Sequence, residues 1–555
     1  MSVNKGKPQF LKQPEVIRNP NPRAPLTAIL KISTDHPAKV LVRITDGIKD
    51  TGVEWPADAA ATERSLPLVG MKPDRLHLIH LKVVDDAGRA NAFGPIEYRT
   101  PPLPAGQSNF PIFHLTRSDP KRLEGGIAIF TVRRRNQGRG IYMTPRQRDF
   151  MTKWSMLVGI DTDGDVVWTY KADVRIAGIE ILANGNIFYH SVAFRSVEID
   201  MLGNEVRAFY ASRRPQGPAK NSVAVDAASI HHQPHCMPNG NFLAMTANAR
   251  EIENYYTSDV DANAPRATGK VVGDRIIEFT PEGKEVWSWN TFDHLDPFRI
   301  GFGTFEPYWD TRGFPKHCDW SHGNGVTYDH KKDTVIISLK HMSAIVGIDK
   351  ASGEIRWIIG NDTGWSEKLR AKLLKPVGPF QMNWNQHNPR VTRRGTILFY
   401  DNGTHAAMPF APAKMPNETF SRAAEFEIDE KARTVKQAWA SATECNDDSV
   451  CVWAMGDAHE LPRTGNVLIV DSMVMTKRKD MQWNEWDRSK LHPNDFPYSV
   501  RIREVTRQSP PEVLWELETH DPDDIMSWEV FGAVHVPTLW AGIKASVSEA
   551  AAIPA

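Results

Sequence analysis

The stretch VGIDKASGEIRWI (346–358) contains the pattern that decides the fold. A short apolar run ends in an acidic residue, a Gly-containing turn follows, and a second apolar run ends near an aromatic side chain. Two apolar runs joined by such a turn are typical of a β-hairpin. The pattern returns in five further places, which are VGIDTDGDVVWTY (158–170), VEIDMLGNEVRAFY (197–210), IEFTPEGKEVWSW (277–289), AEFEIDEKARTVKQAW (424–439) and VRIREVTRQSPPEVLWEL (500–517).

A second pattern, a polar turn followed by an apolar strand, falls between these hairpins. Its copies are LANGNIFYH (182–190), MPNGNFLAM (237–245), YDHKKDTVIISL (328–339), VTRRGTILFY (391–400) and LPRTGNVLIV (461–470). Two hairpins per repeat give four strands, and four-stranded units repeated radially form a β-propeller. Six copies predict six blades. A long β-solenoid, or several sandwiches, is the alternative, but the repeats here are too long and too irregular for a solenoid.

The first hundred residues lack both patterns. They contain short alternating strands separated by Pro and Asp turns, such as AILKIST (28–34), KVLVRIT (39–45) and LHLIHLKVVD (76–85). This spacing predicts a small β-sandwich. The Pro-rich segment 101–111 has the composition of a linker, so we expect a sandwich domain over 1–105 and a propeller domain over 106–555 of an all-β protein.

Helical patterning is rare in this chain. Trp365, Leu369 and Leu373 are spaced as on one face of a helix that Pro376 would end. The Ala/Ser-rich tail 541–555 is expected to be helical or frayed.

Composition excludes several classes of function. Lys plus Arg and Asp plus Glu both number 67, so the formal net charge is zero and the broad basic field of a nucleic-acid-binding protein is absent. We therefore expect neither a nucleic-acid partner nor a membrane partner, since no basic run and no long apolar segment occurs. Four cysteines exclude a disulfide scaffold, and Cys445 and Cys451 form either a small disulfide or two thiols.

Histidines gather in four groups within the predicted propeller. These groups are HHQPHC (231–236), HCDWSHGN (317–324), SLKH (338–341) and NQHN (385–388). A propeller points corresponding ends of its blades at one axis, so groups far apart in sequence can converge on one pocket. Histidine and asparagine beside turns often only satisfy backbone groups. Their recurrence in phase with the repeats favours a shared site.

Other chemistries find little support in the sequence. His231, His232, His235 and Cys236 offer nitrogen and sulfur ligands, but their spacing matches no established closed metal site, so we expect no metal. The sequence has no P-loop, no Rossmann glycine pattern, no GxSxG elbow and no HExxH motif.

Five segments resemble the bacterial arylsulfotransferases. They are HHQPHCMPNGN (231–241), EVWSWNTFDHLDP (285–297), DWSHGNGVTYD (319–329), SLKHMSAIVGIDKASGEIRWIIG (338–360) and QHNPRV with GTILFYDNG (386–403). The resemblance extends to LPLVGMKPDRLHLIHLKVVDDAG (66–88), which is similar to the N-terminal domain of that family. It implies a six-bladed propeller with a central active site, and a homodimer is suggested. The implied reaction moves a sulfuryl group from an aryl sulfate donor to a phenolic acceptor, without a cofactor.

The resemblance also implies the catalytic residues. His387 is the nucleophile that carries the group as sulfohistidine in two ping-pong half-reactions. His322 is a second catalytic histidine, with Asn324 as its hydrogen-bonding neighbour. One of His231 and His232 faces the axis, and the motif leaves open which one.

The chemistry explains the need for these residue types. Neutral imidazole is a competent nucleophile near pH 7 because its ordinary pKa is about 6.5. Cationic donors must meet the sulfonate oxygens, and Lys340 stands where the family has arginine, which keeps the charge but loses the planar fork. Either Lys340 contacts the sulfonate as a point charge, or donor choice has shifted. Trp320 and Tyr328 are candidates for the aromatic wall around the phenol, or else belong to the blade core.

Compartment and alternative functions complete the expectations. The opening residues MSVNKGKPQF contain no apolar segment, so we expect no secretory signal and a cytoplasmic protein. Because the resembling family is mostly exported, the periplasm is the alternative. A non-catalytic interaction platform and a metal- or quinone-dependent propeller enzyme are the alternative functions.

Overall fold

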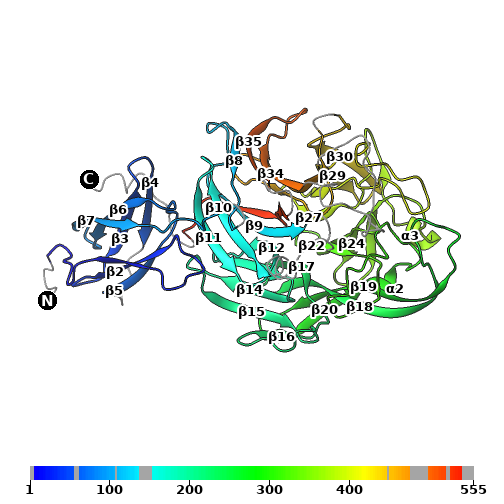
Figure 1. Cartoon of the computed structure of the whole chain (residues 1–555), viewed down its shortest axis with the longest axis horizontal. Helices are drawn as coiled ribbons and strands as arrows, with labels where there is room; N and C mark the ends of the chain where they lie inside the picture. The colour runs from blue at the N-terminus through cyan, green and yellow to red at the C-terminus, as the bar shows by residue number, and fades with distance from the viewer. Residues whose placement is uncertain are drawn as a thin grey trace.

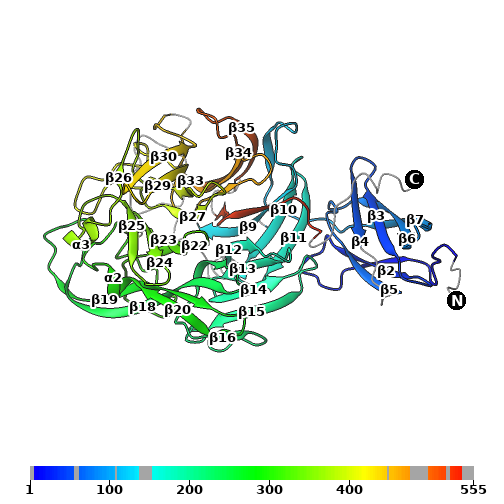
Figure 2. The ribbon, with the colours of Figure 1, turned by 180° about the vertical axis from the view of Figure 1, so that it is seen from behind.

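The computed structural model describes residues 6–55, 62–106, 109–136, 153–446, 449–475, 498–520 and 526–540. Within these ranges nearly all regular structure is β-strand, and the only α-helices are α2 (Thr291–His294) and α3 (Glu367–Arg370). The described strands form eight sheets. Two sheets make up the N-terminal part, which stands beside the six others in both views (Figures 1 and 2).

The N-terminal part is a two-sheet unit, as the alternating pattern predicts. One sheet contains β1 (Glu15–Arg18), β2 (Ala28–Ser33) and β5 (Glu63–Leu68), and the other contains β3 (Lys39–Thr45), β4 (Asp50–Trp55), β6 (Leu76–Val84) and β7 (Ala90–Arg99). Both sheets bury their apolar faces in one core, for example Leu30 against Val40 and Leu81. The predicted domain boundary at 105 falls between the end of β7 and the start of β8 (His114–Ser118).

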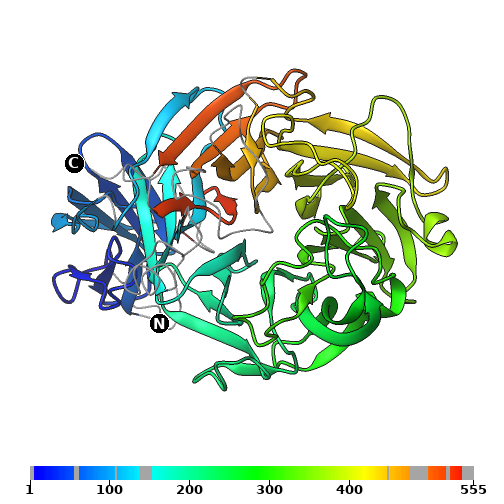
Figure 3. The same cartoon turned by 45° about the vertical axis from the view of Figure 1, so that its right-hand side comes forward.

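The other six sheets follow one another around a common centre (Figure 3). The first sheet contains β9 (Ile127–Asn136), β10 (Ser155–Asp161), β11 (Val166–Ala172), β36 (Met526–Glu529) and β37 (Ala533–Val536). The second contains β12 (Ile176–Ile181), β13 (Ile187–Ser191), β14 (Arg195–Ile199), β15 (Glu205–Ala211) and β16 (Val223–Val225). The third contains β17 (His231–Cys236), β18 (Phe242–Tyr255), β19 (Ala267–Phe279), β20 (Glu285–Asn290) and β21 (Cys318–Asp319). The fourth sheet contains β22 (Gly323–Asp329), β23 (Thr334–Leu339), β24 (Ala344–Asp349) and β25 (Ile355–Gly360). The fifth contains β26 (Lys375–Pro376), β27 (His387–Val391), β28 (Ile397–Asp401), β29 (Arg422–Asp429) and β30 (Thr434–Ala440). The sixth contains β31 (Cys451–Val452), β32 (Asp457–Glu460), β33 (Val467–Met475), β34 (Tyr498–Val505), β35 (Val513–His520) and β8.

The six sequence repeats are antiparallel hairpins, one in each of these six sheets. They correspond to the pairs β10–β11, β14–β15, β19–β20, β24–β25, β29–β30 and β34–β35. The second motif provides the turns before β13, β18, β23, β28 and β33. Both sequence patterns are therefore confirmed as hairpins, and together they account for four consecutive strands in most sheets.

Strands from the two ends of this region complete its first and last sheets. β8 pairs with β35, with Ser118 opposite Trp515. β37 pairs with β9, with Ala533 opposite Phe130, and β36 pairs with β9 as well. Backbone hydrogen bonds thus join strands from the beginning and the end of this region within its first and last sheets.

One local expectation needs correction, and one open alternative is decided. The predicted helix at 365–375 is only α3, which Ser366 caps by accepting a hydrogen bond from the N–H of Leu369. It ends early because the following chain pairs with neighbouring strands, Leu373 with Ile358 and β26 with β30. Of the two alternatives left open for Cys445 and Cys451, the structure shows two thiols with no disulfide between them, Cys445 exposed and Cys451 buried. The tail 541–555 lies outside the described residues.

In the ranges that the structure describes, no helix is both long enough and apolar enough to cross a membrane.

Glycine in the repeat Val-Gly-Ile-Asp packs against tryptophan on the next strand, and this contact yields a stability prediction. Gly347 lies opposite Trp357, and a Cβ on Gly347 would lie 2.2 Å from the tryptophan ring. We expect Gly347→Ala to lower the free energy of unfolding by about 1–3 kcal/mol, because the core must shift to accept the methyl group. Gly159 lies opposite Trp168, where an added Cβ would lie 3.3 Å from the nearest atom, a tighter contact than usual but less severe than at Gly347, so Gly159→Ala is the milder matched control. Urea denaturation measures both, and an equal loss in the two variants would contradict this account.

Candidate active site

His387 is the first residue of the innermost strand β27 and is 2% exposed. Its Nδ1 lies 2.6 Å from Oδ1 of Asn402, at the end of β28. The amide nitrogen of Asn402 donates to the carbonyl oxygens of Val452 and Met455, so its oxygen is the atom that faces the histidine. Nδ1 of His387 therefore carries the proton and Nε2 carries the lone pair. The strand and its neighbour together fix the tautomer that a nucleophile needs.

Nε2 of His387 accepts a hydrogen bond from the backbone N–H of Met455 at 3.3 Å. Burial lowers the pKa of His387 to about 3, and the nearby positive charge of Lys340 contributes. The ring is therefore neutral at physiological pH. A neutral imidazole with a defined lone pair is the state in which histidine attacks an electrophile.

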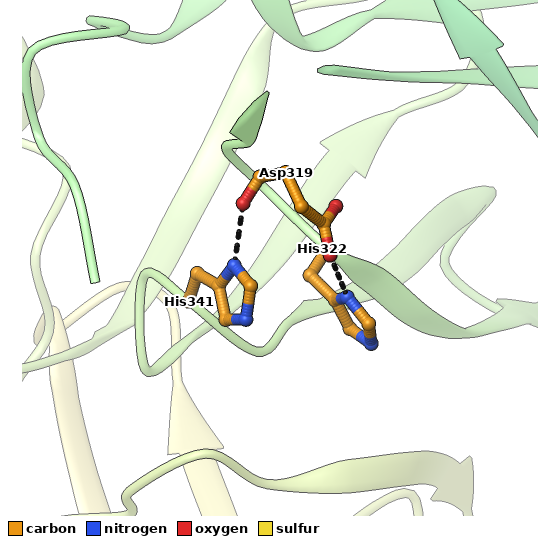
Figure 4. A group of neighbouring side chains, drawn as sticks. All are labelled: Asp319, His322 and His341. Atoms are coloured by element: carbon orange, nitrogen blue, oxygen red, sulfur yellow. Dashed lines mark hydrogen bonds and ion pairs between the residues drawn. The ribbon is translucent and has the colours of Figure 1, made fainter. Parts of the chain in front are cut away.

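His322 comes directly before β22 and is held by Asp319. Its Nδ1 donates to Oδ2 of Asp319, while the backbone oxygen of Asp319 accepts a 2.6 Å hydrogen bond from Nδ1 of His341 (Figure 4). Trp309 Nε1 donates to the other carboxylate oxygen of Asp319 at 2.9 Å. One buried aspartate thus orients two histidines, and it leaves Nε2 of His322 to exchange a proton.

The structure distinguishes the two histidines of the HH pair. His232 lies beside the ring of His322, 5.3 Å between centroids, whereas Nε2 of His231 lies 3.2 Å from Asp274. The two Nδ1 atoms of the pair are 2.9 Å apart. His232 therefore faces the centre, and His231 connects it to a buried carboxylate.

Lys340 brings a positive charge to the same place. Its Nζ lies 3.4 Å from Nε2 of His341, and the ring of His341 lies 4.8 Å from that of His322. After burial, the charge of Lys340 is the next cause that holds the pKa of His322, His341 and His387 below the ordinary value. Lys340 is thus the cation of a cluster of neutral histidines.

Several of these residues have left-handed backbone conformations, which side chains other than glycine rarely adopt. φ is +57° at His232, +45° at His322, +52° at Asn385, +50° at Asn388 and +65° at Met455. Such conformations cost about 1–3 kcal/mol each and gather where the surrounding structure needs a particular geometry. Their position at the starts of the innermost strands marks these starts as a functional centre.

Two of the predicted substrate-wall residues lie elsewhere. Trp320 is fully buried in a hydrophobic core, where its Nε1 donates to the carbonyl of Arg299 and its ring stacks on Phe292. Tyr328 lies near the far end of β22 and donates to Asp333. Trp320 lies in the link between β21 and β22 and packs in a core, and the length of β22 separates Tyr328 from His322, so they serve packing and turn formation.

Asn324 lies at the site and has a supporting role there. Its side chain is fully buried, and Nδ2 donates to the carbonyl of Gln386 at 2.8 Å. This bond ties β22 to the residue immediately before His387. Asn324 therefore helps to position the backbone that carries His387.

The aromatic side chains that do reach the site come from segments between or beyond the repeats. Tyr308, in the segment between α2 and β21, has its ring 4.8 Å from that of His322 and 6.4 Å from that of His232. Phe531, from the segment before β37, lies 6.0 Å from His232. Sequence reasoning missed both, and it missed the partners Asn402 and Asp274. Among the residues that contact these histidines, a sequence motif contains only Asp319, in DWSHGN, and Asn402, in FYDNG. The other contacting residues lie outside any repeated pattern.

Asp319, His322 and His341 each offer a ligand atom within 4.8 Å of the others, which raises the question of a metal. Both Nδ1 atoms already hydrogen-bond to oxygens of Asp319, and the ammonium of Lys340 lies beside Nε2 of His341. A cation would have to displace these bonds and lie next to a like charge. The cluster fits hydrogen-bonded histidines better than a metal centre.

The buried histidines give a prediction for stability against pH. Burial lowers the pKa of His190, His387 and His405 to about 3 from the ordinary 6.5. Below pH 6.5 these histidines bind protons in the unfolded chain but not in the folded chain. The free energy of unfolding therefore falls as the pH falls towards 3, by about 1.4 kcal/mol per pH unit for each such group. We expect urea unfolding at pH 5.5 to show a much lower free energy than at pH 7.5. His190→Gln should make this slope shallower, and an unchanged slope would contradict the assignment.

Comparison with known proteins agrees with this architecture. The model of the family described as Arylsulfotransferase (ASST) matches residues 130–523, and that of the Arylsulfotransferase Ig-like domain matches residues 15–97. Arylsulfate sulfotransferase AssT of Escherichia coli O6:H1 is 28% identical over 212 residues, and that of Lelliottia amnigena is 29% identical over 210 residues; each match covers 30% of this chain and 34% of the relative. The chain thus matches about a third of the length of these curated relatives. Among solved structures, the beta-propeller domain of Myceliophteria thermophila Cps50 (Swd1) is 10% identical, with a TM-score of 0.30 over 76% of this chain and 99% of that one.

An Ig-like domain followed by a propeller-like ring, with histidines at its centre, defines the class of protein. The chain belongs to the arylsulfotransferase family.

Proposed function

We propose that this protein is an arylsulfate sulfotransferase that uses His387 as its nucleophile and a six-bladed propeller as its scaffold. It moves a sulfuryl group from a phenolic sulfate ester to a second phenol, by a ping-pong mechanism and without a nucleotide. The observation that carries the proposal is the fixed tautomer of His387, whose Nδ1–H is bound to Asn402 so that the lone pair lies on Nε2.

In the first half-reaction, the Nε2 lone pair of His387 attacks the sulfur of the donor. An S–N bond forms while the bond from sulfur to the aryl oxygen breaks, and the electron pair leaves with the phenolate. Lys340 balances the charge of the sulfonate oxygens, and the Met455 N–H is placed to donate to them once Nε2 is sulfated. The aryl oxygen leaves as phenolate and takes up a proton from solvent, because the one ring proton of neutral His322 is on Nδ1, where Asp319 holds it.

In the second half-reaction, the acceptor phenol replaces the first product. Nε2 of His322 takes the phenolic proton, the resulting oxygen attacks sulfur, and the S–N bond breaks to regenerate neutral His387. A phenol with a pKa near 10 needs such a base at neutral pH. Tyr308 and Phe531 lie beside His322 and His232 and suit the flat faces of both aryl rings.

The test is phenolate release from a chromogenic aryl sulfate by the purified protein, with no nucleotide, with and without added phenol. We expect release that rises with phenol, and a sulfuryl adduct on the peptide that contains His387 when phenol is omitted. Release that ignores the acceptor would indicate a hydrolase instead. Neither release nor adduct with several donors would overturn the proposal and favour a non-catalytic platform.

A further inference from the structure

Asp274, on β19, is a buried acidic residue that takes no part in the steps above, and it is 2% exposed. Its Oδ2 accepts hydrogen bonds from Oγ of Ser321 and, at 2.6 Å, from the backbone N–H of Gly323. Its Oδ1 lies 3.2 Å from Nε2 of His231. Burial alone would raise the pKa of Asp274, but these partners lower it below the ordinary value, so the group is a carboxylate. One charge therefore contacts two of the segments that carry site histidines.

The bonds of Asp274 determine where the protons of the His231–His232 pair lie. A carboxylate can only accept, so Nε2 of His231 carries a proton and Nδ1 of the neutral ring does not. The two Nδ1 atoms of the pair are 2.9 Å apart, which requires one proton between them, and that proton belongs to His232. Burial lowers the pKa of His232 well below the ordinary value, so this ring holds only one proton. Nε2 of His232 therefore carries a lone pair.

This lone pair is available to a ligand. In the part of the chain that the structure describes, Nε2 of His232 has no hydrogen-bond partner, and His232 is 9% exposed. The ring of His232 lies 5.3 Å from that of His322, and it lies nearly parallel to that of Tyr308 at 6.4 Å. His232 thus places a hydrogen-bond acceptor beside the base that the proposed reaction uses.

The same carboxylate holds the backbone around His322. Gly323 directly follows His322, and a Cβ on Gly323 would lie 2.8 Å from Cγ of Asp274, so only glycine lets the carboxylate reach this N–H. The backbone at His322 has φ +45°, and the residues on both sides of it, Ser321 and Gly323, are bonded to Asp274. Asp274 therefore anchors both His322 and, through His231, its neighbour in the site.

We propose that Asp274 is a positioning residue, which acts through His231 to make Nε2 of His232 a hydrogen-bond acceptor, and that His232 selects acceptor phenols with a second hydroxyl beside the reacting one. The inference rests on the proposed function, in which His322 receives the proton of the reacting hydroxyl. In a 1,2-diphenol the neighbouring hydroxyl donates to His232. A monophenol leaves that nitrogen without a partner, and an ether oxygen at the same position brings a second lone pair against it.

The experiment compares catechol, phenol and 2-methoxyphenol as acceptors for one chromogenic aryl sulfate. The measurement is kcat/KM for each acceptor, and calorimetry with the same three compounds, without donor, measures binding independently of turnover. We expect the wild type to prefer catechol to 2-methoxyphenol by about 5–20-fold in both measurements, as one hydrogen bond and one avoided lone-pair contact imply. Equal values, or a preference for 2-methoxyphenol, would overturn the proposal.

Asp274→Asn tests the connection through His231. Because Ser321 and Gly323 donate to Oδ2, the amide oxygen would remain there and the amide nitrogen would face His231. Nε2 of His231 must then accept, the proton positions of both rings reverse, and Nε2 of His232 becomes a donor. We expect the catechol-to-2-methoxyphenol ratio to fall about 10-fold, because 2-methoxyphenol gains relative to phenol. A merely structural loss does not produce this gain, and an unchanged ratio would overturn the proposal.

Two further variants provide the control and address folding. Glu180→Gln is the matched control, because it alters a carboxylate that pairs with His235, on the same strand as His232, at 3.3 Å, and it should keep the wild-type ratios. His232→Asn removes Nε2 and suits the left-handed φ of +57° at this position, so it addresses the case in which Asp274→Asn does not fold. We expect its catechol-to-phenol ratio to fall about 5-fold, in binding if not in turnover, and a wild-type ratio would overturn the proposal.

The outcomes also distinguish this inference from the proposed function. Turnover with the same acceptor ratios in the wild type, Asp274→Asn and His232→Asn overturns only the roles of Asp274 and His232. Catechol binding that depends on His232, without any phenolate release or adduct, supports the diphenol site and overturns the sulfotransfer reaction. A wild type that neither releases phenolate nor prefers catechol in binding overturns both.

Discussion

Replacing His387 by alanine is expected to reduce phenolate release by about 10³–10⁶-fold and to remove the sulfuryl adduct entirely. Removal of a covalent nucleophile costs this much because the remaining groups have no atom to accept the transferred group. The measurement is initial rate with a chromogenic aryl sulfate, together with mass spectrometry of the enzyme after incubation without acceptor. His387→Gly should regain part of its rate when free imidazole is added, because the cavity left by the ring admits an external nucleophile.

His235→Gln is the matched control for this experiment. His235 lies on the innermost strand β17 but pairs with Glu180, at 3.3 Å, and makes no contact with His322 or His387 among the described interactions. We expect it to keep most of its activity. An active His387→Ala enzyme, or an adduct on another histidine, would show that the nucleophile is misassigned.

Asp319→Asn should have the second largest effect, a loss of about 10²–10⁴-fold in kcat, by analogy with aspartates that orient a catalytic histidine. Trp309 donates to Oδ1 of Asp319, so the amide oxygen of the new side chain would remain there. The amide nitrogen would then face Nδ1 of His322 and force the proton onto Nε2. His322 could no longer accept the proton of the phenol.

The pH profile gives this prediction a second measurement. Burial is the main cause that raises the pKa of Asp319, to about 6. Below that pH the carboxylate takes up a proton and stops accepting from His322, so wild-type kcat should decline on the acid side of pH 6. Asp319→Asn should lack this acid limb. Asp85→Asn alters a buried carboxylate beside His36 in the N-terminal domain and is the control expected to retain both rate and profile.

Much of the fold was predictable because each repeat has a recognisable local residue pattern. The turn and aromatic positions around Gly159 and Gly347 are enough to locate hairpins, and six copies indicate six sheets. The pairing of β8 with β35 was not predictable, since no local pattern links residues 400 positions apart. The helix near Trp365 was overestimated because the strand pairing of the residues that follow α3 outweighs helical periodicity.

Part of the site, likewise, could be predicted from the sequence and part could not. Histidines at the starts of inner strands could be grouped from their phase in the repeat, and the structure brings His232, His322 and Lys340 together. Their partners could not be grouped in this way, because Asn402 lies at the end of a second strand and Tyr308 in a loop between repeats. Aromatic residues near a motif in sequence proved poor guides, since Trp320 packs in a core and Tyr328 lies near the far end of β22.

The closure of the ring by β8, β36 and β37 has a consequence for synthesis. A ribosome adding about 5–20 residues per second needs roughly 20–80 s to progress from Thr116 to Glu516. During that interval β8 and β9 emerge with unpaired backbone groups, the kind of edge that joins other chains. Early sheets can form while the nascent chain is still attached, but His387 meets Met455 only after the sixth sheet has begun to assemble. The newly made protein therefore acquires the contact between His387 and Met455 late, at the stage when the backbone groups of β8 and β9 are being paired.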